Sequence, residues 1–103
     1  MDSKLRRSIS RLTKLMASDM ALSSGRVDVC VDFLKEAGLP PTASGMHDLY
    51  SVASQELGRL SKIVHEEMGR LWEFKPRRAK DLQNFFASEI YKAVEDLDTR
   101  LKM

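Results

Sequence analysis

The fold is decided by residues 46–71, MHDLYSVASQELGRLSKIVHEEMGRL, in which apolar residues recur at a helical period. Their successive spacings are 4, 3, 4, 3, 4, 4 and 3, through Met46, Tyr50, Ala53, Leu57, Leu60, Val64, Met68 and Leu71. A repeat of this kind is nearly a heptad seam, the pattern by which one helix packs along another. The stretch therefore predicts one long amphipathic helix.

The segments on either side keep the same period. Their apolar positions are Leu5, Ile9, Leu12, Met16 and Met20, then Val27, Cys30, Val31 and Leu34, and finally Leu82, Phe86, Ile90, Ala93, Leu97 and Leu101. The short Val27–Val31 run also alternates, but the helical interpretation is preferred because a cap and a glycine stop flank it.

Glycine, proline and capping residues place the helix ends. Ser24 is expected to cap the second helix, and Gly38 followed by two prolines is expected to end it. Thr42 or Ser44 then caps the third helix, and Pro76 suits the first turn of the fourth. The sequence thus predicts an all-α fold of about four helices, over 3–22, 25–37, 44–73 and 77–102, in one domain spanning 1–103.

The two longest predicted helices are each about 40 Å long at 1.5 Å rise per residue. The two shorter helices cannot cover both of them completely. We therefore expect the long helices to form a hairpin or bundle and to complete their packing in a symmetric homodimer, in which helix 44–73, through its seam, or helix 77–102 packs against its copy. The alternative is a four-helix monomer.

The composition limits the compartment and the chemistry. A lone cysteine, Cys30, excludes an intrachain disulfide and suits a reducing compartment. The first 22 residues are too charged for a signal peptide, and no apolar run approaches the roughly 20 residues of a membrane span. A soluble, cytoplasmic protein is expected.

Enzymatic motifs are weak. His47 and His65 lie 18 residues apart with no cysteine cluster near them, Cys30 sits among valines as a small apolar side chain, and the adjacent Glu66 and Glu67 diverge on a helix. The glycines form no phosphate-binding loop. We therefore predict no catalytic residue, no metal and no cofactor.

Aromatic residues gather around the last break, at Trp72, Phe74, Phe85, Phe86 and Tyr91. They are able to stack on unpaired bases, but helical spacing next to a turn favours their packing in the core.

Positive charge is concentrated in two segments although the net charge is only +2. The cationic positions are Lys4, Arg7, Arg11 and Lys14 in the first helix, Arg59, Lys62 and Arg70 in the third, and Arg77, Arg78 and Lys80 after the break. Spacings of 3 and 4 align the first set in one stripe, away from the apolar side of its helix. For one helix alone a solvated face explains such a stripe, but its recurrence favours a surface for a polyanion, read through its shape and backbone.

The opening Met1-Asp2-Ser3-Lys4-Leu5, the arginine-bearing long helix around Arg59 and the Leu71–Leu82 stretch broken at Lys75-Pro76 resemble the small RNA-silencing suppressor of nodaviruses. The resemblance implies an all-α viral homodimer that binds double-stranded RNA without sequence preference and shields it from the host's silencing machinery. It carries an RNA-contacting role onto Arg59 and Lys62.

A second likeness leads to another class. Residues 60–71 followed by Asp81-Leu82 are similar to the last long helix of the membrane-curving BAR domain in sorting nexins, which implies a dimer resting a basic face on anionic lipid. A helical adaptor whose seams are filled by partner helices is a third alternative. Of the three, we predict sequence-independent binding of double-stranded RNA through the ten cationic positions named above.

Overall fold

The structure, a computed structural model, describes residues 2–42 and 46–103. These residues form four helices and no strand: α1 (Asp2–Ser23), α2 (Val27–Glu36), α3 (Met46–Phe74) and α4 (Pro76–Lys102). The all-α helical bundle predicted from the periodicity is confirmed. The predicted start of the third helix and the capping role of Ser44 lie outside the described residues.

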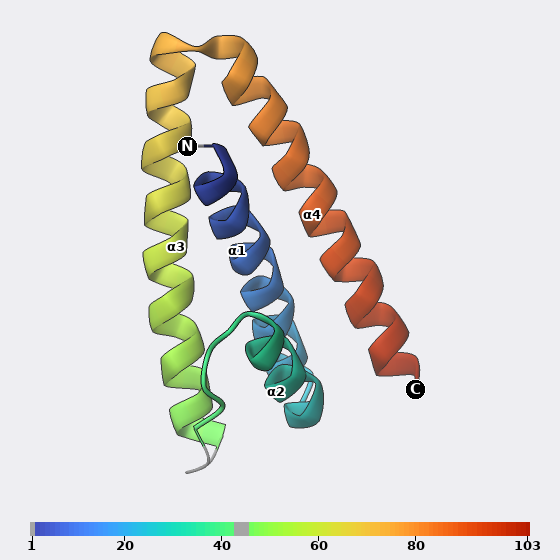
Figure 1. Cartoon of the computed structure of the whole chain (residues 1–103). Helices are drawn as coiled ribbons and strands as arrows, with labels where there is room; N and C mark the ends of the chain where they lie inside the picture. Colours follow the sequence, from blue (N-terminus) through green and yellow to red (C-terminus); the bar gives the residue numbers. More distant parts are fainter. Residues whose placement is uncertain (1, 43–45) are drawn as a thin grey trace.

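Helix α1 is the centre of the fold. Helices α3 and α4 diverge from the turn at Lys75, α1 lies between them, and α2 packs against the C-terminal half of α1 (Figure 1). The molecule is elongated, with principal extents of 44 × 26 × 19 Å. Helix α1 contacts all three other helices and contributes much of the buried core, including Ile9, Leu12 and Leu15.

The core contains predicted apolar positions such as Ile9, Leu34 and Leu60, but also Thr13, Leu15, Ser18 and Phe33, which were not among them. Its largest fully buried side chains are Ile9, Thr13, Leu15, Ser18, Cys30, Phe33, Leu34, Leu60 and Leu82. Cys30 behaves as the predicted apolar side chain, with Sγ 3.2 Å from Oγ of the buried Ser18.

Two glycines end α1 and α2 in the same way. Gly25 and Gly38 have φ of 78° and 76°, the left-handed region that a side chain disfavours. The residue after each glycine donates its backbone N–H five residues back, Arg26 to Ala21 O at 2.9 Å and Leu39 to Leu34 O at 3.0 Å. These are Schellman ends, so the predicted stop at Gly38 is confirmed.

The predicted cap at Ser24 is wrong. Helix α2 begins at Val27 rather than at residue 25, and its N-cap residue is Arg26, without a side-chain capping bond. The Ser24 hydroxyl instead donates to Met20 O at 3.0 Å, within the last turn of α1. The Schellman turn at Gly25 occupies the residues that an earlier start of α2 would need.

The other end signal is confirmed, because Pro76 occupies the first turn of α4. Several apolar side chains that were expected to pack in the core are exposed. Met16 and Met20 are 37% and 47% exposed. Trp72, Phe74 and Tyr91 are also exposed, and only Phe85 and Phe86 of the aromatic cluster pack against the core.

Within the described residues, no helix combines the length and the apolar character that crossing a bilayer requires.

Candidate functional site

A groove of about 730 Å³ runs between α1 and α3 and ends at the turn into α4. Its lining comprises Lys4, Leu5, Arg7, Ser8, Arg11, Arg59, Leu60, Ile63, Glu67, Arg70, Leu71, Phe74, Lys75 and Arg78. Half of these fourteen residues are lysine or arginine, and Glu67 is the one carboxylate among them. The groove is therefore strongly cationic, and we call it the cationic groove.

Helical geometry explains why these cations converge. Lys4, Arg7 and Arg11 follow spacings of 3 and 4 along α1, so they share one side of it. Arg59 and Arg70 are eleven residues apart, close to three full turns of α3, so they also share a side. Packing of α1 on α3 brings the two sides together, although the segments are about fifty residues apart in the chain.

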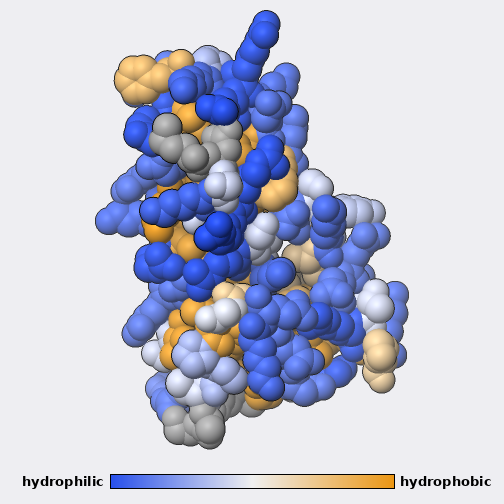
Figure 2. Space-filling model, in the orientation of Figure 1, coloured by the Kyte–Doolittle hydropathy of each residue, from blue (hydrophilic) through white to orange (hydrophobic). Residues whose placement is uncertain are grey.

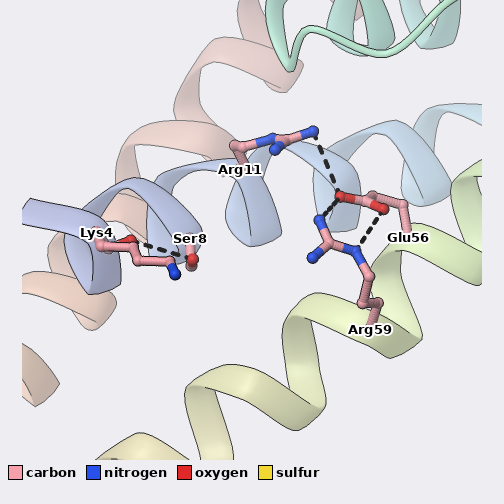
Figure 3. A network of polar contacts seen from close by, with 5 residues as sticks. All are labelled: Lys4, Ser8, Arg11, Glu56 and Arg59. Atoms are coloured by element: carbon pink, nitrogen blue, oxygen red, sulfur yellow. Dashed lines mark hydrogen bonds and ion pairs between the residues drawn. The ribbon is translucent and has the colours of Figure 1, made fainter.

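Glu56 joins the two walls of the groove (Figure 3). Its Oε2 accepts a hydrogen bond from Arg59 Nε at 2.9 Å, and its Oε1 accepts one from Arg59 Nη2 and lies 3.4 Å from Nη2 of Arg11. The hydrogen bonds from Arg59, and the positive charge of Arg59 and Arg11, lower the pKa of the Glu56 carboxyl below its usual value. Glu56 is thus ionised at neutral pH and holds both arginines beside the groove.

The floor of the groove is apolar. Leu60 is buried, Ile63 and Leu71 are half-buried, and Phe74 at the end of α3 is 71% exposed. On the side of the molecule drawn in Figure 2, hydrophobic residues are surrounded by hydrophilic ones where α3 lies. A ligand lying here meets charge at the rim and apolar surface beneath it.

The structure brings together six of the ten predicted site residues: Lys4, Arg7, Arg11, Arg59, Arg70 and Arg78. It places the other four, Lys14, Lys62, Arg77 and Lys80, outside the groove lining. Lys62, Arg77 and Lys80 are exposed and Lys14 is half-buried. The predicted stripe on α1 is therefore divided, and its last member does not reach the groove.

Sequence reasoning missed three features of the site. Lys75 lines the groove, although it is not one of the ten predicted site residues. Phe74 was assigned to the core, and Glu56 was not singled out. The i,i+3 spacing of Glu56 and Arg59 was the available signal for this pair.

Other candidate sites are weak. Among residues 2–42 and 46–103, no group of histidine, cysteine and acidic side chains is arranged to hold a metal ion. Arg6 lies with its guanidinium carbon 4.6 Å from the centre of the Phe85 ring, so this cation contacts α4 rather than the groove.

No protein-family model, curated protein or solved structure matches this chain.

Proposed function

We propose that this protein binds double-stranded RNA without reading its sequence, through the cationic groove. The observation that carries the proposal is the convergence of seven cations from α1, α3 and the start of α4 around one groove. Cations that neutralise phosphates release condensed counterions, which supplies most of the affinity in sequence-independent binding.

The rigidity of the walls favours a duplex over a single strand. Arg59 and Arg70 are about 16 Å apart along α3, at 1.5 Å rise per residue. Glu56 restrains Arg59 and Arg11, and Glu67 pairs with Arg70. Cations held at fixed separations match the regular spacing of the phosphates in a duplex. A single strand loses conformational entropy when its phosphates are held at the same separations.

The biological role in this proposal is suppression of RNA silencing in the cytoplasm, by coating duplexes so that processing enzymes do not reach them. This role rests on the resemblance to the nodavirus suppressors. Anionic membrane and an acidic partner protein are the competing ligands.

The direct test is titration of a random-sequence RNA duplex at several salt concentrations. Lys4→Gln with Arg7→Gln removes two exposed cations from the groove and leaves the Glu56 pairs intact. The slope of log K against log salt is expected to become shallower by roughly 1.8, since each phosphate contact contributes about 0.9.

The matched control is Arg77→Gln with Lys80→Gln, which removes the same charge from exposed positions outside the groove. Its salt slope is expected to stay close to that of the unaltered protein. Equal losses in both variants would contradict a groove-specific site. If the unaltered protein did not bind the duplex but sedimented with anionic vesicles, the result would contradict RNA binding and favour membrane binding.

The homodimer remains part of the proposal, with a different interface from the predicted seam. Ala53, Leu60 and Val64 of that seam are buried within the chain and are not accessible to a second copy. Apolar side chains that stay exposed include Met16 and Met20, one turn apart on α1. Met16→Lys with Met20→Lys should convert a sedimenting dimer into folded monomers. A monomeric unaltered protein would overturn the dimer.

A further inference from the structure

Phe74 is an aromatic side chain exposed inside a cationic site. It lines the groove at the end of α3 and is 71% exposed. The groove cations nearest to it in the chain are Arg70, Lys75 and Arg78. The fold leaves most of this large apolar side chain uncovered, so most of its surface is available to a ligand.

The backbone around Phe74 is fixed by the junction of two helices. The Lys75 N–H donates to Leu71 O at 2.6 Å, and the Ala79 N–H donates to Lys75 O at 3.0 Å. Pro76 restricts its own backbone to a helical φ. Phe74 is therefore presented from a rigid corner of the molecule rather than from a loop.

We propose that Phe74 stacks on the exposed face of the terminal base pair of a duplex whose phosphates lie along the cationic groove. The protein then recognises duplex ends in addition to duplex backbone. This inference rests on the proposed function, because it assumes that the groove holds RNA.

The position of the ring favours an end over the middle of a duplex. Inside a duplex each base pair is covered on both faces by its neighbours, so an aromatic side chain finds an open face only at an end or at an unpaired base. Phe74 lies at the terminus of the groove, about 22 Å along α3 from Arg59 at 1.5 Å per residue. Cations along the groove can therefore hold phosphates of the same duplex whose last base pair meets the ring.

Trp72 provides the matched control. It is also exposed, at 44%, and lies two residues before Phe74 on α3, but it is absent from the groove lining. Comparing variants at Trp72 and Phe74 therefore distinguishes the effect of losing any exposed aromatic side chain from the effect of losing one inside the groove.

The experiment compares one RNA stem in two forms, open with blunt ends or closed at both ends by non-nucleotide linkers that cover the terminal base pairs. Phe74→Ala is expected to weaken binding of the open stem about tenfold, within the range for loss of one stacked base, and to leave binding of the closed stem unchanged. Trp72→Ala is expected to change neither. Because Phe74 is exposed, its replacement should leave the helical circular dichroism signal intact.

A spectroscopic measurement reports stacking directly. The double variant Trp72→Phe with Phe74→Trp carries its single tryptophan in the groove, since the natural chain has only one. Its fluorescence should be quenched by the open stem and not by the closed stem.

Four outcomes would overturn the inference. Equal affinity of the unaltered protein for both stems, with Phe74→Ala harmless, would leave the proposed function standing and remove end recognition. An equal loss for both stems in Phe74→Ala would make the ring a general contact. A loss confined to a third stem, closed at both ends but carrying an internal bulge, would assign the ring to unpaired bases. Binding of neither stem would contradict the proposed function itself.

Discussion

Arg11 in α1 and Glu56 in α3 form an ion pair across the interface of the two helices that build the cationic groove, with Arg11 Nη2 3.4 Å from Glu56 Oε1. The Glu56 side chain is only 14% exposed and is shared with Arg59. One carboxylate therefore ties the helices together and also neutralises part of the charge that the groove offers to a polyanion.

Glu56→Gln should tighten duplex RNA binding while weakening the fold. The change removes the negative charge that competes with phosphate for Arg11 and Arg59, so the salt slope should steepen by about 0.9 for each arginine that gains a phosphate. The free energy of unfolding should fall by less than about 1 kcal/mol, because Arg59 is more than half exposed and solvent screens the pair. Salt-dependent titration and urea denaturation measure the two effects.

Glu73→Gln is the control for this substitution, since Glu73 is exposed on α3 and outside the groove lining. It changes the net charge equally, so any general electrostatic effect appears in both variants. An identical steepening in both would show that Glu56 has no special relation to the site.

Acid should remove the stabilising effect of Glu56. Its pKa is lowered in the folded protein, chiefly by the hydrogen bond from Arg59, so its contribution is present above the unfolded pKa and is lost as pH falls through the folded one. The pKa of Asp28 is also lowered, through its hydrogen bond from Arg26. The pH dependence of stability in the unaltered protein therefore cannot be assigned to Glu56 alone. The difference in unfolding free energy between the unaltered protein and Glu56→Gln isolates Glu56. That difference should shrink below about pH 4.5, the ordinary value of this carboxyl. A difference that stays constant down to the acid limit would contradict the assigned ion pair.

The helices were predictable because their ends depend on local chemistry. Gly38 and Pro76 act through backbone conformations that neighbouring residues cannot override, and the structure uses both as predicted. The predicted cap at Ser24 was wrong because a serine hydroxyl can form either of two local hydrogen bonds. It can cap the following helix or donate to a carbonyl of the preceding one, and the Schellman turn at Gly25 favours the second.

Burial and convergence were less predictable, for a different reason. Periodicity says which residues share a face, but whether another helix covers that face depends on how far the helices diverge. Met20 is on the apolar side of α1 and is nevertheless 47% exposed. Likewise, the stripes on α1 and α3 each predicted a cationic face, whereas the groove between them exists only after the helices pack. Arg59 lines it and Lys62, three residues later, does not.

Two glycines should respond oppositely to alanine. Gly38 has φ of 76°, and nothing lies within 4 Å of a Cβ placed there. Gly38→Ala should therefore introduce backbone strain without a steric clash, and should destabilise the fold by on the order of 1 kcal/mol. Gly58 is in the middle of α3 and its Cβ would also meet open space, so Gly58→Ala should stabilise by about 0.5–1 kcal/mol. Urea denaturation of both variants measures the effects, and a shift of the two in the same direction would contradict the backbone assignment.

Arg100 should determine how firmly the C-terminal end of α4 is held. Its guanidinium lies 4.4 Å from the centre of the buried Phe33 ring, and it pairs with Glu36 at the end of α2 and with Asp96 one turn earlier in α4. Few other contacts join α2 to α4, so Arg100→Gln should lower the free energy of unfolding by about 1–2 kcal/mol.

Amide hydrogen exchange measures this effect. In Arg100→Gln, exchange should accelerate in the last turns of α4 and stay unchanged near Pro76. Lys102→Gln, an exposed cation at the same helix end, should leave exchange unaltered. If both variants exchanged at the same rate, the contacts of Arg100 with Phe33, Glu36 and Asp96 would not be what anchors this end, because the two substitutions remove the same charge.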